Sequence, residues 1–192
     1  ILIHHVSFGH NTVIDTFMGY DELDPNKTHH PLIAKRIKKE TALKVIALGM
    51  FLSTIIAIFL VYYSSGNMFY AMAFFSLFIV TGIIYNDGIS KVSVFDFIPY
   101  SICFASLAGF SYFLIHTSLN RLIILIAVYV GLLVWFQSGI SGEIKEIEIK
   151  SEESLLQKLG TKCSNGKFDM GKAIIYPWIV KLSGLAIAGY IV

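Results

Sequence analysis

Two residues one helical turn apart, Asn11 and Asp15, begin the part of this chain that is best suited to chemistry. Residues at i and i+4 share a helix face, so both side-chain oxygens can point at one ion. Asp21 and Asp24 follow in the same polar stretch, residues 11–32. A few oxygen ligands of this kind suit Mg²⁺, which also takes oxygens from a phosphorylated substrate. The stretch is therefore a candidate site for magnesium and a phosphorylated ligand.

A second acidic stretch, residues 142–160, contains Glu143 and Glu146 three residues apart and Glu153 two turns further on. On a helix these carboxylates also share a face. If both stretches lie at one membrane face, their carboxylates could hold Mg²⁺ ions that bridge a diphosphate. The ions would neutralise the leaving diphosphate as its carbon–oxygen bond breaks.

Two lysines, Lys27 and Lys91, lie in separate polar loops and could add positive charge beside such a diphosphate. The apolar segments between the acidic stretches would accept a long hydrocarbon tail. Acids, lysines and an apolar interior together are suited to chemistry on a prenyl diphosphate.

Simpler interpretations of the two acidic stretches stay open. The first stretch could be a hydrated helix end. The second could be a solvated helix face, where glutamates alternate with Lys145 and Lys150.

The composition is that of a membrane protein. Of 192 residues, 55% are hydrophobic and only 15% are charged, whereas soluble domains carry about 25% charged residues. The net charge of +2 is too small to indicate a nucleic-acid partner. The two cysteines form neither a disulfide framework nor a metal-site spacing, and the histidines show no metal-binding motif.

The pattern of long apolar segments predicts an all-α fold. We expect a polytopic transmembrane helical bundle that forms one domain over residues 1–192. Residues 1–20 are typical of the end of a helix whose polar face points at a bundle interior or a watery cavity. Residues 33–44 form a basic interfacial stretch. Each of five apolar segments is near the ~20 residues that cross a hydrocarbon core; they are residues 41–63, 67–86, 96–116, 120–138 and 173–192.

The distribution of Lys and Arg predicts the topology. The loops at 27–44, 86–95 and 139–172 carry most of these residues, whereas the turns at 63–67 and 117–121 carry one. The positive-inside rule therefore places the three loops in the cytoplasm. Counting spans gives the same alternation, since two spans separate each loop from the next. Both acidic stretches should face the cytoplasm from an integral protein of the cell membrane.

The motifs of this chain resemble those of the UbiA family of intramembrane prenyltransferases. Asn11, Asp15, Asp24 and Lys27, followed by His30-Pro31-Leu32, resemble the family's first aspartate-rich motif. The run GEIKEIEIKSEESLLQKLG resembles its second motif. Tyr85 and Lys91 resemble a Tyr-plus-basic loop near the diphosphate. The resemblance covers essentially the whole chain, which would run from the second to the seventh of the family's nine helices, with cytoplasmic loop helices carrying the two motifs.

The resemblance implies an activity and a set of site residues. The family uses Mg²⁺ to ionise an isoprenyl diphosphate, and an aromatic or lipid acceptor captures the prenyl cation. The implied catalytic and metal residues are Asn11, Asp15, Asp24, Glu143 and Glu146, with Glu153 as a further metal ligand and with Lys27, Tyr85 and Lys91 as diphosphate contacts. The chain departs from the family at Thr12, at His30, and in having glutamates in the second motif.

Three functions are therefore compared. The first is Mg²⁺-dependent prenyl transfer within the bilayer. The second is a non-catalytic relative that binds lipid or quinone, or acts as a scaffold subunit in a membrane complex; the altered second motif motivates it. The third, a small transporter or channel, would need intramembrane charges or broken helices. The chain starts at Ile1 and stops within an apolar run, so we expect it to be part of a longer protein.

Overall fold

The computed structural model describes residues 2–19, 21, 27–86, 97–136, 155–158, 160–164, 167–169 and 171–191. Helices dominate these residues: α1 (Leu2–Phe17), α2 (Lys39–Tyr62), α3 (Met68–Asn86), α4 (Phe97–Phe113), α5 (Arg121–Phe136), α7 (Leu155–Lys158) and α8 (Ile175–Ile191). A 3-10 turn, η3 (Gly171–Ile174), leads into α8. Strands β1 (Lys162–Ser164) and β2 (Lys167–Asp169) form an antiparallel hairpin with Cys163 opposite Phe168.

Every predicted apolar segment contains a helix, so the helical fold class is confirmed at that level. Of the described helices, α2 with 24 residues and α3 with 19 are long and apolar enough to cross a membrane. Helices α4, α5 and α8 have 17, 16 and 17 residues, which corresponds to about 25 Å each at 1.5 Å per residue. The hairpin is an addition to the all-α prediction. Asn165-Gly166 in its sequence is a strong hairpin signal that the prediction did not use.

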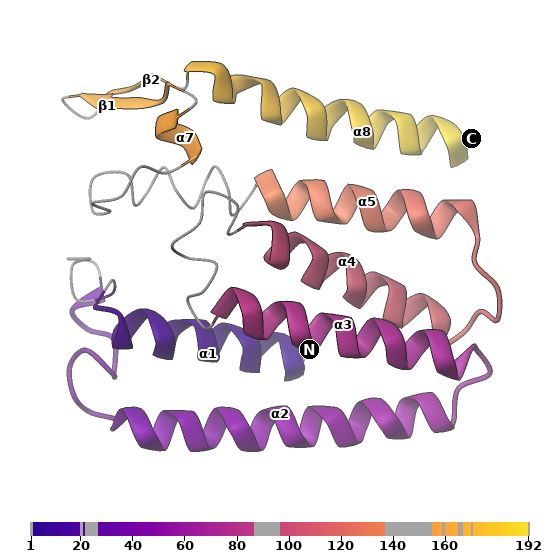
Figure 1. The fold of residues 1–192 in the computed structure, drawn as a ribbon, viewed down its shortest axis with the longest axis horizontal. Coiled ribbons are helices and arrows are strands. Elements are labelled where there is room, and N and C mark those ends of the chain that lie inside the picture. The colour runs from indigo at the N-terminus through magenta and orange to yellow at the C-terminus, as the bar shows by residue number, and fades with distance from the viewer. Residues whose placement is uncertain are drawn as a thin grey trace.

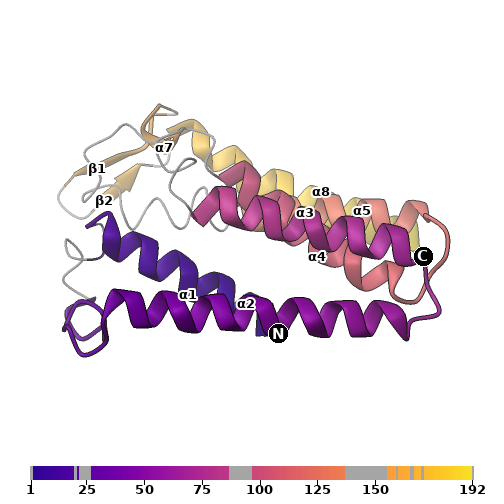
Figure 2. The same cartoon turned by 60° about the horizontal axis from the view of Figure 1, so that its bottom comes forward.

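The main helices lie side by side with alternating directions, so neighbours in sequence are antiparallel (Figure 1). Helix α1 packs on α2 and α3, α3 on α4, α4 on α5, and α5 on α8. Turned by 60°, the molecule shows α1 and α2 as a pair beside the other main helices (Figure 2). Short turns join α2 to α3 and α4 to α5, and such turns favour antiparallel neighbours.

Two clusters of buried side chains hold the bundle together. The larger joins α2, α3 and α4 through Ala57, Val61, Ala71, Phe75, Phe110 and Phe113. The smaller joins α1, α3 and α4 through Ile3, Phe78 and Cys103. Both clusters use α3, on which Ala71 is 0% exposed and Phe75 is 3% exposed. Helix α3 thus positions α1 relative to α4.

The connections gather at two opposite ends of the bundle. At one end, the backbone N–H and side-chain Nδ2 of Asn67 donate to the carbonyl oxygens of His116 and Thr117, each over 3.1 Å. These bonds clasp the α2–α3 turn to the α4–α5 turn, so the two turns lie together as predicted. The other end collects the C-terminal end of α1, the start of α2, α7 and the hairpin (Figures 1 and 2).

Candidate functional site

Asn11 and Asp15 lie on one face of α1 and contact one another directly. The Asn11 Nδ2 donates to Asp15 Oδ2 over 2.8 Å. Asn11 Oδ1 is buried and has no hydrogen-bond partner among the described residues. A buried carbonyl-type oxygen without a partner costs about 1–3 kcal/mol, so it is a prepared acceptor for a cation or an N–H or O–H group. The predicted sharing of a face is confirmed.

The polar face of α1 lines a cavity between α1, α3 and α4. The cavity has a volume of about 60 Å³, and its polar lining consists of His4, Ser7, Asn11, Tyr85, Asn86, Tyr100 and Cys103. Because about 10–15 Å³ of such volume is enough to hold a water molecule, the cavity has room for a few waters or a small hydrated group. The prediction that the polar face of residues 1–20 points into the bundle is confirmed for His4, Ser7 and Asn11.

Helix α3 brings Tyr85 to the same cavity as Asn11. The Tyr85 ring stacks on the Tyr100 ring of α4, with centroids 4.5 Å apart and an angle of 25° between the planes. The next residue, Asn86, is 2% exposed, and its Nδ2 donates to the carbonyl oxygen of Ser7 over 3.1 Å. The same nitrogen lies 3.3 Å from His10 Nδ1. These contacts fix the end of α3 against the middle of α1.

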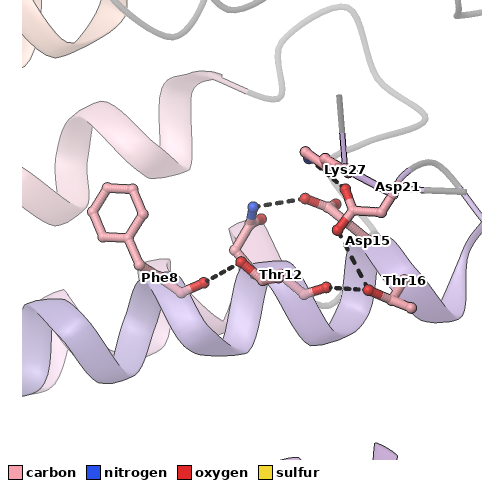
Figure 3. Close-up of polar contacts among 7 residues, drawn as sticks. Phe8, Thr12, Asp15, Thr16, Asp21 and Lys27 are labelled. Carbon is pink, nitrogen blue, oxygen red and sulfur yellow. Dashed lines mark hydrogen bonds and ion pairs between the residues drawn. The ribbon is translucent and has the colours of Figure 1, made fainter. Parts of the chain in front are cut away.

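A second polar group continues from α1 at its C-terminal end. Asp21 is 2% exposed, and Lys27 Nζ donates to its Oδ1 over 2.5 Å. The Thr16 hydroxyl lies 3.3 Å from the other carboxylate oxygen and 2.9 Å from the Thr12 carbonyl oxygen. Figure 3 shows the Asp21 carboxylate with its bonds to Lys27 and to the Thr16 hydroxyl at this end of the helix. Lys27, predicted to contact diphosphate, thus pairs with an acid of the first stretch.

The predicted site is only partly covered by the described residues. Asn11, Asp15, Lys27 and Tyr85 are described. The remaining candidates lie outside the described residues: Asp24, Lys91, Glu143, Glu146 and Glu153. Within the described ranges, no group of three or more His, Cys, Asp or Glu side chains could hold a metal ion. A magnesium site on Asn11 and Asp15 would therefore need ligands beyond these two residues.

Two residues of the site are not predicted from the sequence. Asn86 begins the predicted loop at 86–95, but in the structure it ends α3 and is buried. Tyr100 lies within the predicted apolar segment 96–116, but in the structure it lines the cavity. A polar residue at the last position of an apolar run, as in Tyr85-Asn86, is the sequence signal that points to Asn86.

An apolar groove lies on another side of α4. It measures about 370 Å³ and runs between α4 and α5, with Phe74 of α3 and Leu119 also contributing. Gly109 and Gly131 lie along it, and none of the described residues that line it is charged. Its surface suits a hydrocarbon chain.

Comparison of the chain with protein-family models, with curated proteins and with solved structures finds no match.

Proposed function

We propose that this protein transfers a prenyl group from an isoprenyl diphosphate to an aromatic or lipid acceptor within the membrane, in a Mg²⁺-dependent reaction. The observation that carries the proposal is the polar face of α1, where Asn11 contacts Asp15 and shares a cavity with Tyr85. This polar face lies inside a helical bundle whose outer surface is rich in exposed apolar side chains. The family resemblance, which no comparison with known proteins supports, supplies the reaction class.

The residues present fit a magnesium ion. Mg²⁺ requires oxygen ligands, and Asn11 Oδ1 and the Asp15 carboxylate would supply two of them. Asp24, Glu143, Glu146 and Glu153 would complete the set. When bound, the ion neutralises charge on the departing diphosphate. In this proposal the Asn11 amide turns by 180°, since its nitrogen now faces Asp15 and only an oxygen can bind a cation.

The described residues can take further parts in the reaction. The carbon–oxygen bond of the substrate breaks, and diphosphate leaves with the bonding electrons as an allylic cation forms. The stacked rings of Tyr85 and Tyr100 present π faces beside the cavity, and such faces attract cations. Lys27 would meet the diphosphate after exchanging its bond with Asp21 for one with the substrate. The acceptor then forms the new bond and loses a proton.

Diphosphate release tests the proposal. The purified full chain in lipid vesicles is incubated with geranyl, farnesyl and geranylgeranyl diphosphates, with and without Mg²⁺ and a panel of acceptors. We expect Mg²⁺-dependent release that falls at least a hundredfold in Asp15→Ala. Glu40→Gln is the matched control, because Glu40 is an exposed carboxylate in the first turn of α2. Release that is absent throughout, or unchanged in Asp15→Ala, contradicts the proposal.

A second candidate is a non-catalytic subunit that binds lipid or quinone. The groove between α4 and α5 favours it, because a lining without charges binds a hydrocarbon chain without requiring the acids of α1. A chain that binds a fluorescent quinone or lipid equally well as wild type and as Asp15→Ala, and that releases no diphosphate, would support this function.

A further inference from the structure

The cations between α1 and α2 divide into two groups. Lys27 and Lys39 point at protein atoms: Lys27 bonds to Asp21, and Lys39 Nζ donates to the Thr16 carbonyl oxygen over 3.1 Å. Lys35, Arg36 and Lys38 are exposed. No hydrogen bond or ion pair joins these three side chains to another residue in the described part of the chain. We call residues 35–38 the basic turn.

The backbone holds the basic turn in a defined shape. The N–H of Arg36 donates to the Pro31 carbonyl oxygen over 2.8 Å, and the N–H of Lys35 donates to the Leu32 carbonyl oxygen over 3.1 Å. This pair of bonds is the Schellman arrangement that ends a helical turn, with Lys35 at the left-handed position. Its φ is 54°, where glycine or asparagine is usual. The chain therefore carries a lysine at a position where a neutral residue would fit the backbone better.

The length of α2 places the basic turn at a membrane surface. The exposed side chains of α2 are apolar from Val45 to Leu60, and Tyr62 and Tyr63 are exposed at the far end, as in the aromatic belts of membrane interfaces. From Lys44 to Tyr62 the helix rises about 27 Å, close to the ~30 Å hydrocarbon core. Lys38 lies about 9 Å further out than Lys44 along the axis, beyond the edge of this core.

We infer that the basic turn binds the headgroups of anionic phospholipids at the membrane surface. Three exposed cations at headgroup level complement the phosphate and net negative charge of such lipids, and the exposed Ile37 between them can enter the interface. Each Lys or Arg side chain next to an anionic leaflet strengthens binding to that leaflet by about fivefold. The inference rests on the membrane placement of α2 and is independent of the proposed chemistry, so either can fail alone.

The test measures lipid selectivity at the protein surface. The full chain is reconstituted in phosphatidylcholine vesicles with trace spin-labelled phosphatidylglycerol or spin-labelled phosphatidylcholine, and the fraction of immobilised label gives the relative association constant. We expect wild type to prefer phosphatidylglycerol by about fivefold or more. The variant combines Lys35→Asn, which suits the left-handed backbone, with Arg36→Gln and Lys38→Gln; its preference should fall close to one.

The control removes the same number of charges from exposed positions outside the basic turn, through Arg121→Gln, Lys162→Gln and Lys172→Gln. Because Lys162 and Lys172 lie toward the same end of the bundle as the start of α2, the preference of this control should fall, but by clearly less than that of the basic-turn variant. A second variant, Lys35→Arg with Arg36→Lys and Lys38→Arg, retains the charges and should keep the wild-type preference. The inference is overturned if wild type shows no preference, if neutralising the basic turn leaves the preference unchanged, or if the control loses it equally.

Discussion

The side-chain amide of Asn86, at the end of α3, donates to the backbone carbonyl oxygen of Ser7, in the middle of α1, over 3.1 Å. The bond joins residues far apart in the sequence, and both residues line the cavity that Asn11 and Tyr85 share. A carbonyl in the middle of a helix already accepts from its own helix, so this second bond is a tertiary contact. It determines which part of α1 faces the candidate site.

Replacing Asn86 by Ala should therefore loosen α1. The Ser7 carbonyl loses its second partner and a buried side chain is truncated, so we expect a loss of about 1–2 kcal/mol in unfolding free energy. For a chain of this size, that loss lowers the thermal midpoint by about 2–8 °C. The measurement is thermal unfolding in detergent. Thr41→Ala, on the exposed side of α2, is the control and should leave the midpoint nearly unchanged.

Gly66 lies in the α2–α3 turn, which the bonds of Asn67 join to the α4–α5 turn. A Cβ added at Gly66 would lie 2.0 Å from the Phe113 carbonyl oxygen, and backbone cannot yield as a flexible side chain can. Gly66→Ala should therefore separate the α2–α3 turn from the α4–α5 turn and destabilise the protein by several kcal/mol. Gly189→Ala is the matched control, because its Cβ would meet nothing within 4 Å. In a helix this change should be neutral or stabilising by up to about 1 kcal/mol. Equal thermal midpoints for the two variants would contradict a close contact between the two turns at Gly66.

Lys39 links the start of α2 to the end of α1. Its Nζ donates to the Thr16 carbonyl oxygen and lies 4.7 Å from the centroid of the Phe17 ring. A cation beside the last carbonyls of a helix is stabilising, so Lys39→Met should cost about 1 kcal/mol. Lys44→Met, which removes an exposed lysine from the same helix, should cost less. Thermal midpoints at low and high salt check this, and a larger effect for Lys44→Met would count against the contact.

Asp21 and Lys27 should behave as a coupled pair. Lys27→Met leaves a carboxylate that is 2% exposed without its cation, whereas the further change Asp21→Asn removes that unpaired charge. We therefore expect the double variant to be more stable than Lys27→Met alone. A double-mutant cycle on unfolding free energies should give a coupling of about 1 kcal/mol, since Lys27 is 43% exposed and solvent weakens the pair. Additive effects would show that the two residues act independently.

The helices could be predicted from sequence because uninterrupted apolar runs of this length favour helices over strands. The polar face of α1 could be predicted as well, since His4, Ser7 and Asn11 repeat at helical spacing. The position of Asn86 could not, because its burial depends on Ser7, a residue on another helix. The pairing of Asp21 with Lys27 likewise depends on how the chain turns after α1. The hairpin differs from the predicted polar loop because its strands are only three residues long, too short for an alternating apolar pattern to stand out.

Binding of a non-hydrolysable prenyl diphosphate analogue tests the central claim most directly. The full chain in vesicles is titrated with the analogue, with and without Mg²⁺, as wild type, Asp15→Asn and the control Glu40→Gln. The account predicts binding to wild type and to the control that requires Mg²⁺, and a weakening of about tenfold or more in Asp15→Asn, the loss of roughly one charge-assisted contact. Binding that ignores Mg²⁺, or that is equal in wild type and Asp15→Asn, would contradict it.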